Sequence, residues 1–196
     1  MLASITPLGE RARRSNWTTT TVFYLLGATS AGAAGGVLAG LVGSLVFGDV
    51  TIGVRLAVVA AALAVGLVAE VARGAVPGPR RQVNEQWLDR YRGWVYGLGF
   101  GAQLGAGVTT VVVSSAVYAV WLAALASAHP LTGLAIGTTA GGLRGATVLA
   151  GASVTGPQSL MAFHERMGAL ESPVRLAGLA AQIALAGLAL VAAVGV

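Results

Sequence analysis

The chain has 196 residues, of which 56% are hydrophobic and 10% are charged, and its mean hydropathy is +0.79. Soluble domains carry about 25% charged residues, so this composition excludes a soluble globular protein and indicates a membrane protein. The absence of cysteine excludes disulfides, thiolate nucleophiles and cysteine-based metal sites. The formal net charge is +5. In a membrane protein such an excess reflects topology, so we expect no nucleic-acid partner.

Five apolar segments are long enough to cross the lipid bilayer, which takes about 20 residues per helix. They predict an all-α fold, a polytopic transmembrane helix bundle that forms a single integral membrane domain over residues 1–196. The predicted spans are residues 21–47, 52–71, 94–124, 131–152 and 174–194. Pro130 suits the first turn of the fourth span, and Ser172-Pro173 predicts an N-cap and first helical residue for the fifth.

The placement of arginine predicts how the chain is oriented. All twelve basic residues are arginine, and ten of them lie before the first span or in and beside the connections 72–93 and 153–173. By the positive-inside rule, the N-terminus and both connections are cytoplasmic and the C-terminus is outside. Within the second connection, residues 157–168 predict a short helix lying on the membrane surface.

Small residues recur every four positions in the first and third spans. Lipid provides no hydrophobic drive between helices, so small residues that allow close backbone approach become the contact surface. The glycines of these faces are Gly32, Gly36, Gly40, Gly97, Gly101 and Gly105. They predict helix packing within one bundle. The alternatives are a seam between copies of the chain and a flexible transport helix.

Polar side chains within the predicted spans are candidates for a substrate path. They are Gln103, Thr109, Thr110, Thr138, Thr139 and Arg144. Arg144 is the most costly, because a charge near the centre of a membrane helix costs about 2.5 kcal/mol or more. Glu70 is the only acidic residue in a predicted span and is a possible ion-pair partner for Arg144. The alternatives for Arg144 are an anion-attracting position in a polar cavity and snorkelling to the interface.

The sequence gives no basis for an enzyme. It contains no P-loop, dinucleotide-binding fingerprint or nucleophile elbow. Its two histidines, His129 and His164, do not stand at ligand spacing from other metal-binding residue types. We therefore expect no catalytic residue, no metal site and no cofactor.

Two stretches carry a resemblance to a known family: ITPLGERARRSNWTTTTVFYLLGATSAGA (Ile5 to Ala33) and WVYGLGFGAQLGAG (Trp94 to Gly107). They resemble actinobacterial membrane proteins of the sulfite-exporter TauE/SafE-like group. That group is similar to the cytochrome c biogenesis transmembrane family of the CcdA/DsbD type. The resemblance covers about two thirds of the chain. It implies six helices in two inverted repeats, each opened by a cysteine-bearing, often proline-broken segment.

This chain departs from that family pattern in two ways. It begins at Met1, where the first of the six helices is expected to have ended, so five spans are expected. The redox families place their Cys-Pro element where this chain has Gly101, Gln103 and Leu104. Because the chain has no cysteine, a thiol–disulfide relay is excluded. The resemblance then implies a bacterial plasma (inner) membrane protein that translocates a small anionic solute. The alternative is a non-catalytic structural or assembly subunit that packs through its glycine faces, as a homo-oligomer or against other membrane subunits.

Overall fold

A computed structural model describes residues 5–73, 86–107 and 114–195, and all regular structure in these ranges is helical. The expectation of an all-α fold is therefore confirmed. The helices are α1 (Pro7–Ala12), α2 (Trp17–Phe47), α3 (Ile52–Arg73), α4 (Gln86–Arg90), α5 (Gly93–Ala106), α6 (Ala116–Ala126), α7 (Pro130–Ala146), the 3-10 helix η1 (Thr147–Ser153) and α8 (Pro157–Val194). In the described part of the chain, α2, α3 and α8 are long and apolar enough to cross a membrane.

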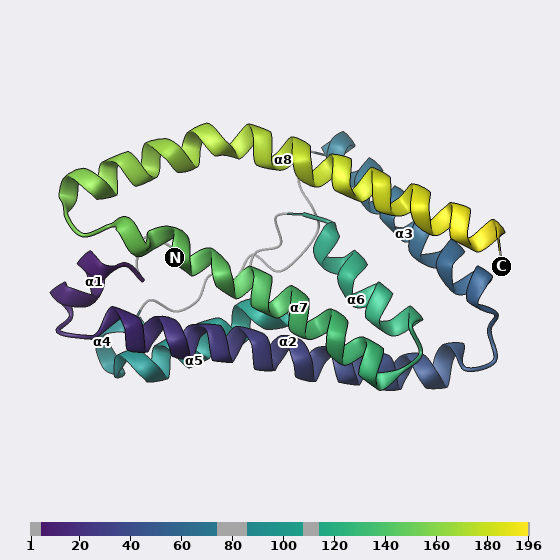
Figure 1. The fold of residues 1–196 in the computed structure, drawn as a ribbon, viewed down its shortest axis with the longest axis horizontal. Coiled ribbons are helices and arrows are strands. Elements are labelled where there is room, and N and C mark those ends of the chain that lie inside the picture. The colour runs from purple at the N-terminus through teal and green to yellow at the C-terminus, as the bar shows by residue number, and fades with distance from the viewer. Residues whose placement is uncertain (1–4, 74–85, 108–113, 196) are drawn as a thin grey trace.

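The long helix α2 organises one half of the bundle. At 1.5 Å per residue its 31 residues extend about 46 Å. It packs extensively against α5 and α7, whereas α8 has its main contacts with α3, and α6 contacts α2, α3 and α7 (Figure 1). The short helices α1 and α4 lie at one end of α2 (Figure 1). The tight connection to α3 leaves from the other end (Figure 1).

Glycines set how closely α2 approaches its neighbours. A methyl group on Gly36 would overlap the carbonyl oxygen of Gly133 in α7, and one on Gly101 would overlap the carbonyl oxygen of Tyr24. The same overlap with a neighbouring helix backbone occurs at Gly32, Gly40, Gly97 and Gly105. All six predicted packing glycines therefore lie in helix contacts within the chain, as small-residue packing in lipid requires.

The third predicted span, residues 94–124, is not one helix. α5 ends at Ala106, and Gly107 follows in the left-handed conformation (φ 71°) before α6 begins at Ala116. A left-handed residue at this position ends a helix, and glycine adopts it without a steric cost. Gly107 is therefore the local reason why α5 ends within the predicted span.

The predicted start of the fifth span at Ser172-Pro173 is wrong. α8 is continuous from Pro157 to Val194 and contains Pro173 in its interior. The predicted surface helix 157–168 is thus its first part, and its N-terminal proline is Pro157. The prediction failed because proline is tolerated inside long membrane helices more readily than in soluble ones. In the fourth span Pro130 does occupy the first turn, and the α-helix ends at Ala146 with η1 continuing to Ser153.

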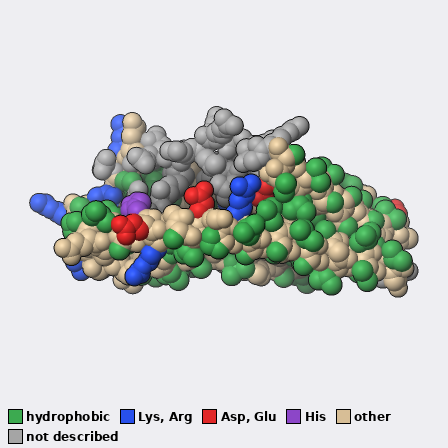
Figure 2. Space-filling model, turned by 90° about the horizontal axis from the view of Figure 1, so that it is seen from above, with side chains coloured by type: hydrophobic (Ala, Val, Ile, Leu, Met, Phe, Trp, Pro, Cys, Tyr) green, Lys and Arg blue, Asp and Glu red, His purple; other side chains and the backbone are tan. Residues whose placement is uncertain are grey.

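The outer surface is largely apolar, as expected for helices that face lipid. In Figure 2 hydrophobic side chains cover much of the molecule toward the C-terminal end of α8. Most of the charged side chains on this face lie away from that end (Figure 2). Exposed large hydrophobic residues of α8 include Leu176, Ile183, Leu188 and Val191. An apolar surface of this extent on a soluble monomer would be exceptional.

A candidate polar site at the break between α5 and α6

The interruption between α5 and α6 gathers polar groups from four helices. The region is defined here as the helix-break site: Gly107 at the end of α5, Ser114 and Ser115 at the start of α6, Glu70 of α3, Arg144 of α7 and Gln182 of α8. The groups fall into two clusters. One cluster holds the carboxylate and the other holds the guanidinium.

Arg144 lies against the bare backbone of Gly107. A methyl group on Gly107 would stand 3.4 Å from Arg144 Nη1 and 3.2 Å from the indole nitrogen of Trp121 in α6. Arg144 is half-buried. η1 adds seven residues beyond α7. With 1.5 Å per residue to the end of α7 and about 2.0 Å per residue in η1, Arg144 remains roughly 17 Å from the end of this helical segment.

The second cluster consists of Glu70 and Gln182, which form hydrogen bonds with the residues at the start of α6. One carboxylate oxygen of Glu70 accepts hydrogen bonds from the Ser115 backbone N–H (2.9 Å) and from the Ser115 hydroxyl (2.8 Å). The Ser114 hydroxyl also donates to it, at 3.2 Å. Gln182 donates from Nε2 to the Ser114 hydroxyl oxygen, and its Oε1 lies 2.7 Å from the Ser115 hydroxyl. Both Glu70 (6% exposed) and Gln182 (3% exposed) are buried.

This arrangement provides hydrogen-bond acceptors for the donors at the start of α6. The N-cap residue Ser115 makes no side-chain cap of its own, so Glu70 supplies the acceptor from another helix. A carboxylate is favourable there because the first N–H groups of a helix carry partial positive charge. The Ser115 hydroxyl has one proton, so it donates to either Glu70 or Gln182 at any moment.

The structure does not bring Glu70 and Arg144 together as an ion pair. In the described ranges the recorded salt bridge is the one between Glu10 and Arg13, and the hydrogen bonds to Glu70 come from Ser114 and Ser115. The sequence placed both charges on the inner half of their spans but did not reveal that Glu70 is hydrogen-bonded to the start of α6. The helix break, which supplies Glu70 with N–H and hydroxyl donors, removes its need for an arginine.

The other predicted path residues are divided. Gln103 is half-buried in the last turn of α5, one turn before Gly107, and Thr138 is half-buried in α7. Thr139 is exposed on the outer surface of α7. Thr109 and Thr110 lie outside the described residues. Of the predicted path residues, Gln103 is therefore close to Gly107 in the sequence, and Arg144 lies against Gly107 in the structure.

Sequence reasoning missed Gln182 and the specific role of Ser115. Gln182 is the single amide in the apolar half of α8, and that isolation was the available signal. Ser114-Ser115 directly follows the β-branched sequence VTTVVV (108–113), and serine favours helix N-termini. Across the described residues no three histidine, aspartate or glutamate side chains gather in a way that could hold a metal ion.

Comparisons with known proteins leave the site to be interpreted on its geometry. No family model, no curated protein and no solved structure matches the chain.

Proposed function

We propose that this chain is a multi-pass protein of the bacterial plasma membrane that translocates a small anionic solute. In this proposal the five crossings are α2, α3, α5 with α6, α7 with η1, and α8. The 14 residues of α5 and the 11 of α6 extend about 21 Å and 17 Å. Neither length crosses the hydrocarbon layer alone, but the two in series do.

The observation that carries the proposal is the position of Arg144 beside an interrupted helix. Non-helical backbone at membrane depth is tolerated where it is buried in protein or lines a polar cavity. In many transporters such interruptions form the solute site, with helix ends and unpaired backbone groups facing the solute. Arg144 adds a fixed positive charge at this place, which favours an anion over a cation or a neutral solute.

The proposed orientation of the chain in the membrane follows from the end of the bundle at which the arginines lie. Arg11, Arg13 and Arg14 lie in or just after α1, and Arg90 and Arg92 lie in or just after α4. Because α1 and α4 occupy the same end of α2 (Figure 1), five arginines gather at one end of the bundle. By the positive-inside rule this end is cytoplasmic in the proposed topology.

Transport by purified protein in vesicles tests the proposal. We expect wild-type protein to take up labelled sulfite or another small inorganic anion, and Arg144→Ala to lose this uptake while remaining folded. Arg166→Ala is the matched control, because Arg166 is exposed on α8 and this substitution removes the same charge. Equal uptake in Arg144→Ala and the control, or no anion uptake by wild type, contradicts the proposal.

A structural or assembly subunit is the second candidate, and one observation favours it. The glycines of α2 and α5 are already in contact within the chain, so they offer no free seam. In α8, however, Gly168, Gly178 and Gly187 meet no described atom of another helix near the position of a Cβ, each on a different face of α8. A partner helix could approach α8 closely at one of them. Native mass spectrometry from mild detergent distinguishes the two: a different chain in the complex supports a subunit, and a single chain species supports a self-contained transporter.

A further inference from the structure

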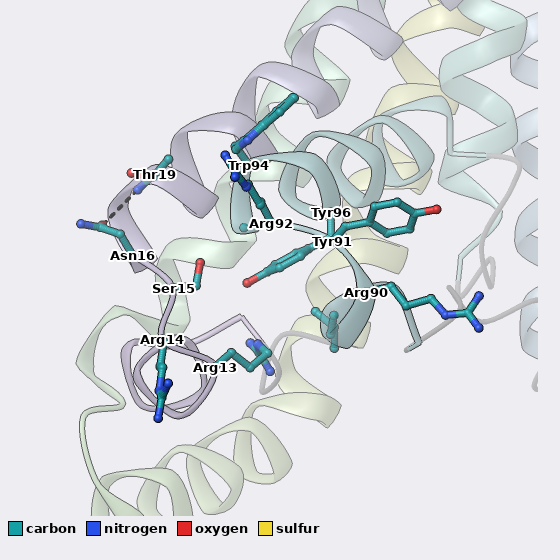
Figure 3. A pocket seen from close by; sticks show the side chains of 12 residues that line it. Arg13, Arg14, Ser15, Asn16, Thr19, Arg90, Tyr91, Arg92, Trp94 and Tyr96 are labelled. Carbon is teal, nitrogen blue, oxygen red and sulfur yellow. Dashed lines mark hydrogen bonds between the residues drawn. The ribbon is translucent and has the colours of Figure 1, made fainter.

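A cavity of about 570 Å³ lies at the arginine-rich end of the bundle, away from the helix-break site. Two segments distant in the sequence enclose it: the connection from α1 to α2, and the connection from α4 to α5. Each contributes two arginines to its walls, Arg13 and Arg14 from the first and Arg90 and Arg92 from the second (Figure 3). Trp94 also lines the cavity. Its size falls within the range of small-molecule sites in proteins.

The charge on one of these arginines is already balanced. Glu10 is completely buried beneath the cavity and accepts a hydrogen bond from Arg13 (2.7 Å) and one from Thr20 (2.8 Å). The hydroxyl of Tyr96 also donates to it. Burial alone would raise the pKa of Glu10, but these hydrogen bonds hold it below its ordinary value, so Glu10 is ionised and neutralises Arg13.

Three arginines remain as excess charge. Arg14, Arg90 and Arg92 line the cavity, and among the described lining residues there is no acidic side chain to offset them. Arg14 and Arg92 are exposed to solvent. Arg14 also has a left-handed backbone (φ 55°), a conformation that glycine adopts more readily than a residue with a side chain. Among the described lining residues the unbalanced charge is therefore positive, which favours an anion.

Two helix N-termini add to this field. Asn16 and Thr19 place the start of α2 on the cavity, and Gly93 and Trp94 place the start of α5 there. In α2 the side chain of Asn16 accepts from the N–H groups of Thr18 and Thr19. The N-cap residue of α5, Arg92, makes no side-chain cap. The first N–H groups of a helix have no partner within the helix, and they favour an anion.

We propose that this cavity binds the phosphate group of an anionic ligand, toward whose oxygens the side chains of Arg14, Arg90 and Arg92 turn from the different directions that they take in Figure 3. Guanidinium groups match phosphate with two parallel hydrogen bonds, which favours a phosphate over a simple halide. The phosphate can come from an anionic lipid headgroup or from a soluble phosphate ester. The lipid source fits the location, because Trp94 is 45% exposed beside the cavity and packs on Phe23 of α2. Aromatic side chains of this kind mark the membrane interface, where basic pockets hold lipid headgroups.

Thermal unfolding of the intact protein in a neutral detergent tests the proposal. Three probes are titrated separately: dioctanoyl phosphatidylglycerol, dioctanoyl phosphatidylcholine and glycerol 3-phosphate. The test variant is Arg14→Gly with Arg90→Gln and Arg92→Gln, which spares Arg13 and relieves the left-handed position. The matched control is Arg11→Gln with Arg166→Gln and Arg175→Gln, three exposed arginines that do not line the cavity. Both variants lose three positive charges.

We expect phosphatidylglycerol to raise the melting temperature of wild type and control in a saturable way. In the test variant the concentration needed should rise roughly 100-fold, since each arginine near a lipid surface contributes about a fivefold factor. A lipid site predicts no comparable effect of glycerol 3-phosphate, whereas an equal effect of that probe identifies a soluble phosphate ester. The proposal is overturned if no anionic probe stabilises the wild type, if phosphatidylcholine acts as strongly as phosphatidylglycerol, or if both triple variants respond alike.

Discussion

The two halves of the bundle use glycine in opposite ways. In the half built on α2, glycines face the backbone carbonyl oxygens of α5 and α7, so the helices lie in direct contact. In α8 the glycines at 168, 178 and 187 have no described atom of another helix near the position of a Cβ, and the helix has its main contacts with α3. Side chains take over there: Glu70 of α3 and Gln182 of α8 meet at the start of α6. One half is therefore fixed by backbone shape and the other by a buried polar cluster.

Gly36→Leu should break the first half and have the largest effect. A side chain at this position overlaps the carbonyl oxygen of Gly133, and neither helix backbone can move aside without losing its other glycine contacts. We expect a loss of stability of about 3 kcal/mol or more, at the upper end of overpacking effects. The measurement is the yield of monodisperse protein in mild detergent together with its melting temperature.

The matched control for Gly36→Leu is Gly187→Leu in α8. Both variants replace a membrane glycine with the same apolar residue, but Gly187 has open space around it. Normal yield and melting temperature are expected for this control. If the two variants unfold alike, the distinction between the halves is wrong.

Glu70→Ala should separate the second half from α6. It removes the acceptor for the Ser115 N–H and for the hydroxyls of Ser114 and Ser115. A buried donor left without a partner costs about 1–3 kcal/mol. Glu70→Gln is the control, because its amide oxygen can still accept from the Ser115 N–H. Melting temperatures of the two variants should therefore differ, with the alanine variant lower, and equal values would show that the cluster does not hold α6.

The sequence predicted the long apolar helices, because long apolar runs are a local pattern. α3 begins at Ile52 and α7 begins at Pro130, within one residue of the predicted starts. The end of α5 at Gly107 was missed because hydropathy stays high across residues 94–124, and hydropathy does not show where a glycine adopts a left-handed backbone. Pro173 led to the wrong prediction of a helix start, because whether a proline begins a helix or lies inside one depends on its neighbours as well as on the proline itself.

The polar sites were harder to predict, because they depend on which helices become neighbours. Arg144 and Gln103 were identified as unusual from their cost alone, and both lie in the helices that meet at the break. Glu10 was not identified, since a single acidic residue in an arginine-rich segment resembles an ordinary solvated charge. Its burial follows from the way α1 folds back onto α2 and α5, which no local pattern in the sequence predicts.

Gly107→Ala tests the junction between the two halves. The residue has a left-handed backbone, and an added methyl group would also press on Arg144 and Trp121. We expect a loss of about 1–2 kcal/mol from the backbone conformation. Gly142→Ala is the control, because its nearest neighbour is an ordinary van der Waals contact, Thr29 Oγ1 at 3.7 Å. A melting temperature for Gly107→Ala equal to that of the control would contradict the left-handed assignment.

Acid should weaken the α2 half at its arginine-rich end, and the effect should be the smallest of the four. Although burial alone would raise the pKa of Glu10, hydrogen bonds from Tyr96, Arg13 and Thr20 keep it below the ordinary value of 4.5. In the unfolded chain the carboxyl group returns to that ordinary pKa. Ionised Glu10 therefore stabilises the folded state fully above pH 4.5, and this stabilisation is lost as the pH falls through the lower folded-state pKa.

The measurement for Glu10 is the difference in melting temperature between wild type and Glu10→Gln from pH 7 down to pH 3. The difference should be largest near neutral pH and should shrink in acid, because protonation removes from the wild type the charge that the variant already lacks. Glu165→Gln is the matched control, since Glu165 is exposed on α8 and this substitution removes the same charge. A difference for Glu10→Gln that stays constant with pH, like that of the control, would mean that α1 is held by packing of Ile5 and its neighbours rather than by the ionised carboxylate.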